Sequence, residues 1–123
     1  MQVGQLLRTH VRAGGTFTTP PFCIGELWRL ASEPRGYGHP PEYTLQFLRG
    51  WLLRAPAASL TESFGSALSD ALGKTLPIGA AVFDVCIGVA AREAGAAELW
   101  TLDRRFPEIE RLTVVRRPFI ERL

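Results

Sequence analysis

Residues 83–106 read FDVCIGVAAREAGAAELWTLDRRF and contain the most informative pattern in the chain. The first half is almost wholly apolar and predicts a buried helix over about 80–94, with Asp84 in its first turn. The second half predicts a strand over 98–101, followed almost at once by Asp103. A carboxylate against apolar surface costs free energy unless its charge is compensated. Two such acids at the ends of elements therefore indicate a divalent-metal site.

The rest of the chain alternates helices with short strands. The spacing of apolar residues, Pro and Gly predicts helices over about 2–13, 21–32 and 41–55, a helix from the capping box Ser59–Glu62 to Gly73, and strands over 16–19, 98–101 and 112–115. This alternation indicates an α/β sandwich with a short, mostly parallel sheet flanked by helices. Three strands are few for a sheet covered on both faces, so we expect a central strand to be missing from the front of the chain. No repeat or linker interrupts the pattern, which predicts a single domain over residues 1–123.

The composition is that of an ordinary globular protein. Of 123 residues, 46% are hydrophobic and 21% are charged, which allows a core without disulfides. No window approaches eighteen apolar residues, and the first residues lack the layout of a signal peptide, so we expect a cytoplasmic protein without a membrane segment. Cys23 and Cys86 lie in apolar helical patterns and are expected to be buried free thiols. Two Cys and two His are too few for a clustered zinc centre.

The charge distribution is more informative than the net charge of +2. Thirteen of the fourteen basic residues are Arg, and six of these fall between Arg104 and Arg122. Because the Arg guanidinium is a good fork for phosphate, this stretch could hold an RNA or DNA backbone. The alternative is that the preference for Arg over Lys only reflects genome composition.

Each candidate metal ligand also has a simpler interpretation. Asp84 is the only charge between Lys74 and Arg92, and it could instead be an acid favoured by the helix dipole. Asp103 could be a turn residue that bonds its own backbone. Glu26 lies on an apolar helical face, and could instead be solvent-exposed.

Other catalytic patterns are missing from the sequence. It contains no Gly-x-Gly-x-x-Gly, no phosphate-binding loop ending in Lys-Ser/Thr and no serine in a nucleophile elbow. His39, between Gly38 and Pro40, is expected to be a loop residue rather than a catalyst. The three Trp side chains are expected to anchor the core rather than to stack on bases.

The candidate residues, taken together, resemble a known family. The segment from Phe83 and Asp84 through Arg92–Gly95 to the pattern Thr101-x-Asp103-x-x-Phe106 resembles the C-terminal half of a PIN domain, in particular the VapC-type toxin ribonucleases of bacterial toxin–antitoxin pairs. Upstream, the segment 23–30 is similar to the family's helix that carries one metal-binding glutamate, and 34–38 fits the loop after it. Pro118 after a final short strand is also similar, so that the likeness spans about 14–118.

The resemblance implies a fold, an activity and a set of site residues. The implied fold is a PIN-like three-layer sandwich, and the implied activity is Mg²⁺- or Mn²⁺-dependent hydrolysis of RNA phosphodiester bonds. Glu26, Asp84 and Asp103 correspond to three of the family's four metal-site acids, and Thr101 matches the hydroxyl that supports the last of them. Implied partners are an RNA substrate, a cognate antitoxin protein and a second copy in a homodimer.

The sequence departs from the family in two places. The family's first acid ends a first, central strand in a Leu-Asp-x-Asn-like segment that this chain lacks. Arg105 stands where many members have an acidic or amide residue, which makes the site more positive. We expect either a true translation start upstream of Met1, which the intact core pattern favours, or a truncated remnant. The second case predicts a non-catalytic module that binds an antitoxin or another copy of itself.

Overall fold

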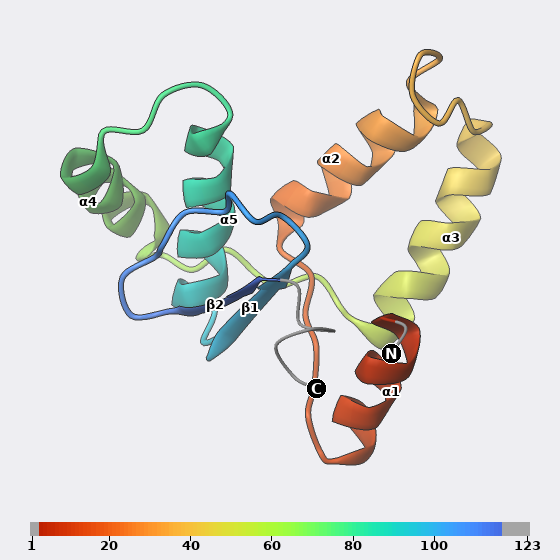
Figure 1. Cartoon of the computed structure of the whole chain (residues 1–123), viewed down its shortest axis with the longest axis horizontal. Coiled ribbons are helices and arrows are strands. Elements are labelled where there is room, and N and C mark those ends of the chain that lie inside the picture. The colour runs from red at the N-terminus through yellow and green to blue at the C-terminus, as the bar shows by residue number, and fades with distance from the viewer. Residues whose placement is uncertain (1–2, 117–123) are drawn as a thin grey trace. The chain divides into compact units, whose positions relative to one another are not determined.

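The structure is a computed structural model that describes residues 3–116 (Figure 1). The five helices and two strands of these residues make it an α/β protein, as the sequence predicts. Pro118, part of the family resemblance, lies outside the described residues, and so do Arg117 and Arg122. Within the described range no helix combines the length and apolar character needed to cross a bilayer.

The chain divides into two compact units. The first unit is built from α1 (Val3–Arg12) and from residues 60 onward, and the second unit comprises Phe17–Ser59. The prediction of a single domain stays a prediction. The two units are described separately below.

The first unit has its core between one helix, a short sheet and the loop that joins the two strands. α4 (Phe64–Thr75) packs against α5 (Ala81–Glu93). β1 (Glu98–Thr101) pairs in parallel with β2 (Thr113–Arg116), with Leu99 opposite Val114 (Figure 1). Their core cluster consists of Ala91, Leu99, Phe106, Ile109 and Leu112.

The buried character of α5 follows from its small and apolar side chains. Val89 is fully buried, and Val85, Ala90 and Ala91 are buried with it. Gly88 allows the loop before β2 to approach closely, because a Cβ at this position would lie 2.5 Å from Cγ1 of Ile109. The predicted end of the helix is confirmed by Gly95, which follows it with a φ of 94°.

The second unit is a pair of helices joined by a short loop. α2 (Pro21–Ser32) and α3 (Pro41–Arg54) pack against each other, and each begins with a proline whose missing N–H is not needed in the first turn. Thr19 ties the two ends of the unit together. Its hydroxyl donates to the Ala55 carbonyl at 2.8 Å and accepts from Nε1 of Trp51 at 2.9 Å.

The predicted strand over 16–19 is wrong. Only Thr19 pairs, in an isolated parallel bridge with Ala57, although the β-branched and aromatic composition favours a strand. A strand needs a partner along several residues, and Pro20 and Pro21 end the extended segment directly after the bridge. The described residues therefore contain a sheet of two strands rather than three.

Two predicted boundaries also differ. The last strand begins at Thr113, one residue later than predicted, because Leu112 is in a bridge with Ile109. The capping box prediction is wrong: α4 begins after Ser63, whose side chain makes no cap bond. Its hydroxyl donates instead to Oε1 of Glu93 at 2.8 Å.

Candidate metal site

Asp84 lies in the first turn of α5, as the sequence predicts, and its side chain is half-buried. Burial raises the pKa of this carboxyl above its ordinary value, and the negative charge of Asp103 raises it further. An effect of one carboxylate on the other requires that the two lie near each other. The first turn of α5 and the loop after β1 therefore bring two acids together within the first unit.

Asp103 is held in a turn by short hydrogen bonds. The backbone N–H of Asp103 donates to Oγ1 of Thr101 at 3.1 Å, and Oδ1 of Asp103 accepts from the backbone N–H of Arg105 at 2.8 Å. The second bond is the one expected of a turn aspartate. The same bonds orient an exposed carboxylate at the end of β1, so the two interpretations of Asp103 are compatible.

Glu26 belongs to α2 in the second unit, where its side chain is 53% exposed. Nη2 of Arg29, one turn further along the helix, lies 2.6 Å from its Oε1. The hydrogen bond from Arg29 lowers the pKa of Glu26. This is the environment of a surface acid, and the (i, i+3) spacing of Glu26 and Arg29 in the sequence is the signal from which it could have been inferred.

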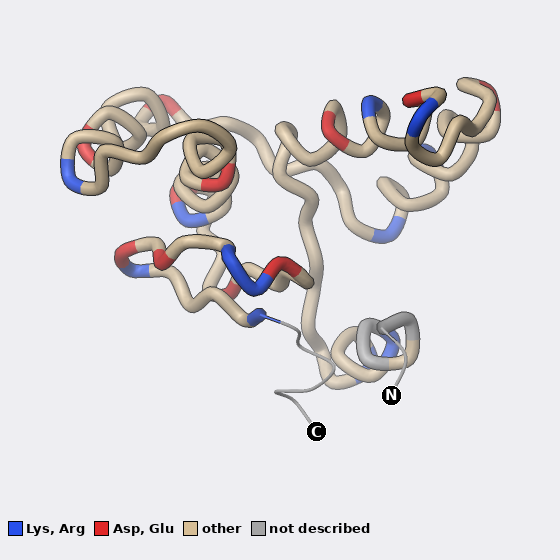
Figure 2. Tube along the Cα trace, turned by 45° about the horizontal axis from the view of Figure 1, so that its top comes forward, with Lys and Arg blue, Asp and Glu red and all other residues tan. Residues whose placement is uncertain are grey.

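The side chains around the acidic pair are both basic and apolar. Arg104 and Arg105 directly follow Asp103 and are exposed. Figure 2 shows how the basic and acidic residues are distributed along the chain. Phe83 and Leu102, each next to one of the two acids in the chain, are 68% and 61% exposed. Sequence reasoning did not single out these two apolar residues, although their adjacency to the acids is visible in the sequence.

The donor set at this place suits a hard cation that keeps most of its water. Magnesium is commonly held by one or two carboxylates together with several waters. Burial is the larger cause of the raised pKa of Asp84 and the charge of Asp103 the smaller, and a bound cation would favour the charged form of this carboxyl. Throughout residues 3–116, no three His, Cys, Asp or Glu side chains form a group that could hold a metal ion. Two carboxylates are a donor set that Mg²⁺ and Mn²⁺ accept.

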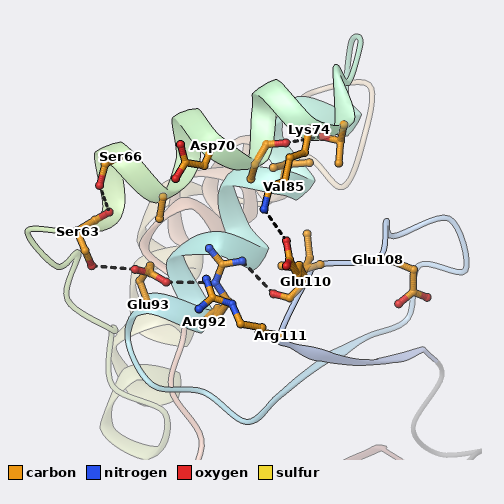
Figure 3. A pocket seen from close by; sticks show the side chains of 14 residues that line it. Ser63, Ser66, Asp70, Lys74, Val85, Arg92, Glu93, Glu108, Glu110 and Arg111 are labelled. Carbon is orange, nitrogen blue, oxygen red and sulfur yellow. Dashed lines mark hydrogen bonds and ion pairs between the residues drawn. The ribbon is translucent and has the colours of Figure 1, made fainter.

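A groove of about 530 Å³ lies elsewhere in the first unit, between α4, α5 and the loop before β2 (Figure 3). Oε1 of Glu93 accepts from Ser63, and Oε2 of Glu93 lies 3.1 Å from Nε of Arg92. Nη1 of Arg92 donates to the backbone carbonyl of Glu110 at 2.9 Å, and the Glu110 carboxylate pairs with Lys74 at 2.9 Å.

The charges of this groove are neutralised by one another. The hydrogen bond from Ser63 lowers the pKa of Glu93, and the one from Lys74 lowers the pKa of Glu110. Arg92 has a side chain only 11% exposed, and it links α5 to the loop that supplies Ile109 to the core. The network therefore has a structural explanation: it fixes the loop before β2.

The chain was compared with models of protein families and with curated proteins. No family model matches it, and no curated protein matches it.

Proposed function

We propose that this chain is a metal-dependent endoribonuclease of the PIN type, the toxin of a toxin–antitoxin pair. The observation that carries the proposal is the proximity of Asp84 and Asp103, one from the first turn of a helix and one from the end of a strand. The sequence resemblance supports the finer statements. These are a PIN-like three-layer sandwich, an RNA substrate, a cognate antitoxin, a homodimer and a cytoplasmic location.

Each residue of the site has a distinct proposed role. Asp84 and Asp103 would hold Mg²⁺ or Mn²⁺. Glu26, which is paired with Arg29 in the second unit, is left out of this set. Thr101 orients the Asp103 turn through the bond to its backbone N–H. The exposed Arg104 and Arg105 supply positive charge for the RNA backbone. A bound cation would polarise the phosphodiester and make a bound water a better nucleophile.

The proposal is tested by RNA cleavage with the chain as it is. We expect cleavage that depends on Mg²⁺ or Mn²⁺ and stops in EDTA. Asp84→Asn and Asp103→Asn should each lower the rate at least 100-fold, because loss of one of the two acids leaves a single fixed ligand. Asp70→Asn, an exposed acid on α4, is the matched control and should cleave as the wild type does. Equal rates in all four proteins would show that the acidic pair has no catalytic part.

A second candidate function is a protein-binding module without catalysis. It is supported by large exposed apolar side chains on the loop between α4 and α5 and in the first turn of α5: Ile78 is 89% exposed, Leu76 75% and Phe83 68%. Exposed apolar groups gathered in this way mark contact surfaces. Leu76 also adopts a left-handed φ of 47°, which costs free energy for a residue with a Cβ.

Sedimentation equilibrium separates the second candidate from the first. If the chain associates through these residues, Ile78→Asp lowers the measured mass toward that of a monomer. Leu53→Asp, which alters an 85% exposed leucine on α3, is the control and should keep the wild-type mass. A wild-type chain that is monomeric at every concentration and also cleaves RNA would refute self-association as its function.

A further inference from the structure

Three aromatic rings lie against one another at the surface of the second unit. The rings of Tyr37 and His39 are parallel within 2°, with centroids 6.1 Å apart. The rings of His39 and Tyr43 are tilted by 36°, with centroids 5.0 Å apart. Tyr37 is 75% exposed, Tyr43 is 57% exposed and His39 is also exposed. We call these three side chains the aromatic ladder.

The loop that carries Tyr37 and His39 is held by its own backbone, and Tyr43 lies in the first turn of α3. The N–H groups of Gly36 and Gly38 both donate to the Glu33 carbonyl, at 2.9 and 3.0 Å. The N–H of His39 donates to the carbonyl of Ala31 at 2.8 Å, which anchors the loop to the last turn of α2. Gly38 has a φ of 59°, a conformation that glycine adopts without the penalty of a Cβ. The backbone under Tyr37 and His39 is therefore ordered before any ligand arrives, which lowers the entropy cost of binding.

The chemistry of the ladder suits flat, aromatic ligands. Residues 33–43 read EPRGYGHPPEY and contain no Leu, Ile, Val or Met, so the loop lacks the aliphatic groups of a typical protein contact. Exposed Tyr and His rings stack on unpaired bases, and this stacking tolerates any base because each has a π face.

The charges near the ladder indicate contact with bases more than with phosphates. The segment 33–43 contains two acids, Glu33 and Glu42, and one basic residue, Arg35. All three are exposed. Since two acids offset one guanidinium, electrostatic attraction for a phosphate backbone is small here. Stacking is the interaction that the ladder offers.

We propose that the aromatic ladder of Tyr37, His39 and Tyr43 is a stacking site for unpaired bases of single-stranded RNA. The choice of RNA rests on the proposed nuclease function. The ladder adds to that proposal a binding site outside the acidic pair and a preference for unpaired over paired nucleotides. An RNA duplex presents only its two terminal base faces, so it would occupy the ladder poorly.

Fluorescence anisotropy tests the proposal with the full chain in EDTA, where metal-dependent cleavage is stopped. The probes are a labelled ten-nucleotide oligoadenylate and a blunt RNA duplex of ten pairs. Tyr37→Ala and Tyr43→Ala should each weaken oligoadenylate binding about 5- to 100-fold. Tyr37→Phe keeps the ring and should bind within twofold of the wild type, as should the control Leu53→Ala. The slope of log Kd against log salt should be the same for Tyr37→Ala as for the wild type, because no phosphate contact is lost.

The outcomes separate this inference from the proposed function. If neither alanine substitution changes oligoadenylate binding, the proposed stacking site is refuted, whatever the cleavage assay shows. Loss of binding in these variants, in a chain that does not cleave RNA, supports the ladder and refutes the nuclease. A wild-type chain that binds the duplex as tightly as the oligoadenylate overturns the preference for unpaired bases. Tyr37→Leu is a second test: it keeps an apolar side chain at an exposed position but removes the aromatic face, and it should bind as weakly as Tyr37→Ala.

Discussion

The substitution Asp84→Asn should change the stability of the protein in opposite directions with and without a divalent cation. Without the cation, Asp84 is half-buried near Asp103, and its raised pKa shows that the charged form is disfavoured in the folded state. The helix dipole favours an acid in the first turn of α5 by a few tenths of a kcal/mol and opposes part of this effect. An amide at this position removes the repulsion.

The expected gain is small because solvent screens these charges. Asp84 is only half-buried and Asp103 is exposed, so we expect the Asn variant to be more stable by about 0.5 kcal/mol, within the range of exposed charge pairs. With Mg²⁺ at 100 times its Kd, the wild type gains about 2.7 kcal/mol. If loss of one ligand weakens binding about tenfold, the variant gains only about 1.4 kcal/mol. The variant is then less stable than the wild type by about 0.8 kcal/mol.

Thermal unfolding at pH 7 in EDTA and in Mg²⁺ measures both differences. For a chain of this length we expect the Tm of Asp84→Asn to be about 2 °C above the wild type in EDTA and about 3 °C below it in Mg²⁺. The pH dependence has a definite sign. A carboxyl whose folded pKa is raised makes the protein less stable as the pH rises through that pKa, and the effect vanishes below the ordinary pKa of an aspartate. The advantage of the variant in EDTA should therefore disappear at low pH. Equal Mg²⁺-induced shifts in the wild type, in Asp84→Asn and in the control Asp70→Asn would refute a cation site at the acidic pair.

Three further predictions concern the packing and the charges around the site. Gly88→Ala should lower the free energy of unfolding by about 1–3 kcal/mol, because its Cβ would lie 2.5 Å from Cγ1 of the buried Ile109; denaturant unfolding measures it. Val89→Ala should lower it by roughly 2 kcal/mol, since the side chain is fully buried and its loss leaves a cavity. Arg29→Ala should return the pKa of Glu26 toward its ordinary value by removing the hydrogen bond that lowers it, and a carboxyl NMR titration measures this.

Each of these predictions has a control or an opposing result. Val11→Ala removes the same two methyl groups from a side chain that is 55% exposed, and should cost little. If the Gly88→Ala variant unfolds at the same denaturant concentration as the wild type, Ile109 moves aside without a measurable cost. For Arg29, a titration of Glu26 identical in both proteins would contradict the ion pair of α2.

Much of the helical structure was predictable because its signals are local. The helix Pro21–Ser32 agrees with its predicted range, since a proline at the first position and apolar spacing act within the segment itself. α5 and the stop at Gly95 follow in the same way. Asp84 in a first turn and Asp103 after a strand were also local properties of the sequence. The pairing of Glu26 with Arg29 was equally local, and the sequence analysis missed it.

Other features depended on partners far away in the chain. The segment 16–19 has the composition of a strand, but pairing is a property of two segments, and only Thr19 meets a partner. The hydroxyl of Ser63, directly before α4, donates to Glu93, which lies thirty residues later in the chain. Arg92 donates a hydrogen bond to the backbone carbonyl of Glu110. This contact cannot be predicted from the side chains in the sequence, because every residue has a backbone carbonyl.

By itself the sequence determined that residues 3–116 contain five helices and, except for the bounds of α4, where they lie. It also determined where both strands of the sheet lie to within one residue, and which acids stand at the ends of α5 and β1. Those properties follow from short-range periodicity, proline and glycine. Only the tertiary structure decided that Asp84 and Asp103 are close enough for one charge to raise the pKa of the other. It likewise decided that Tyr37, His39 and Tyr43 lie ring against ring at the surface. The physical reason is that electrostatic coupling and ring stacking depend on distance in space, which the order of residues along the chain does not set.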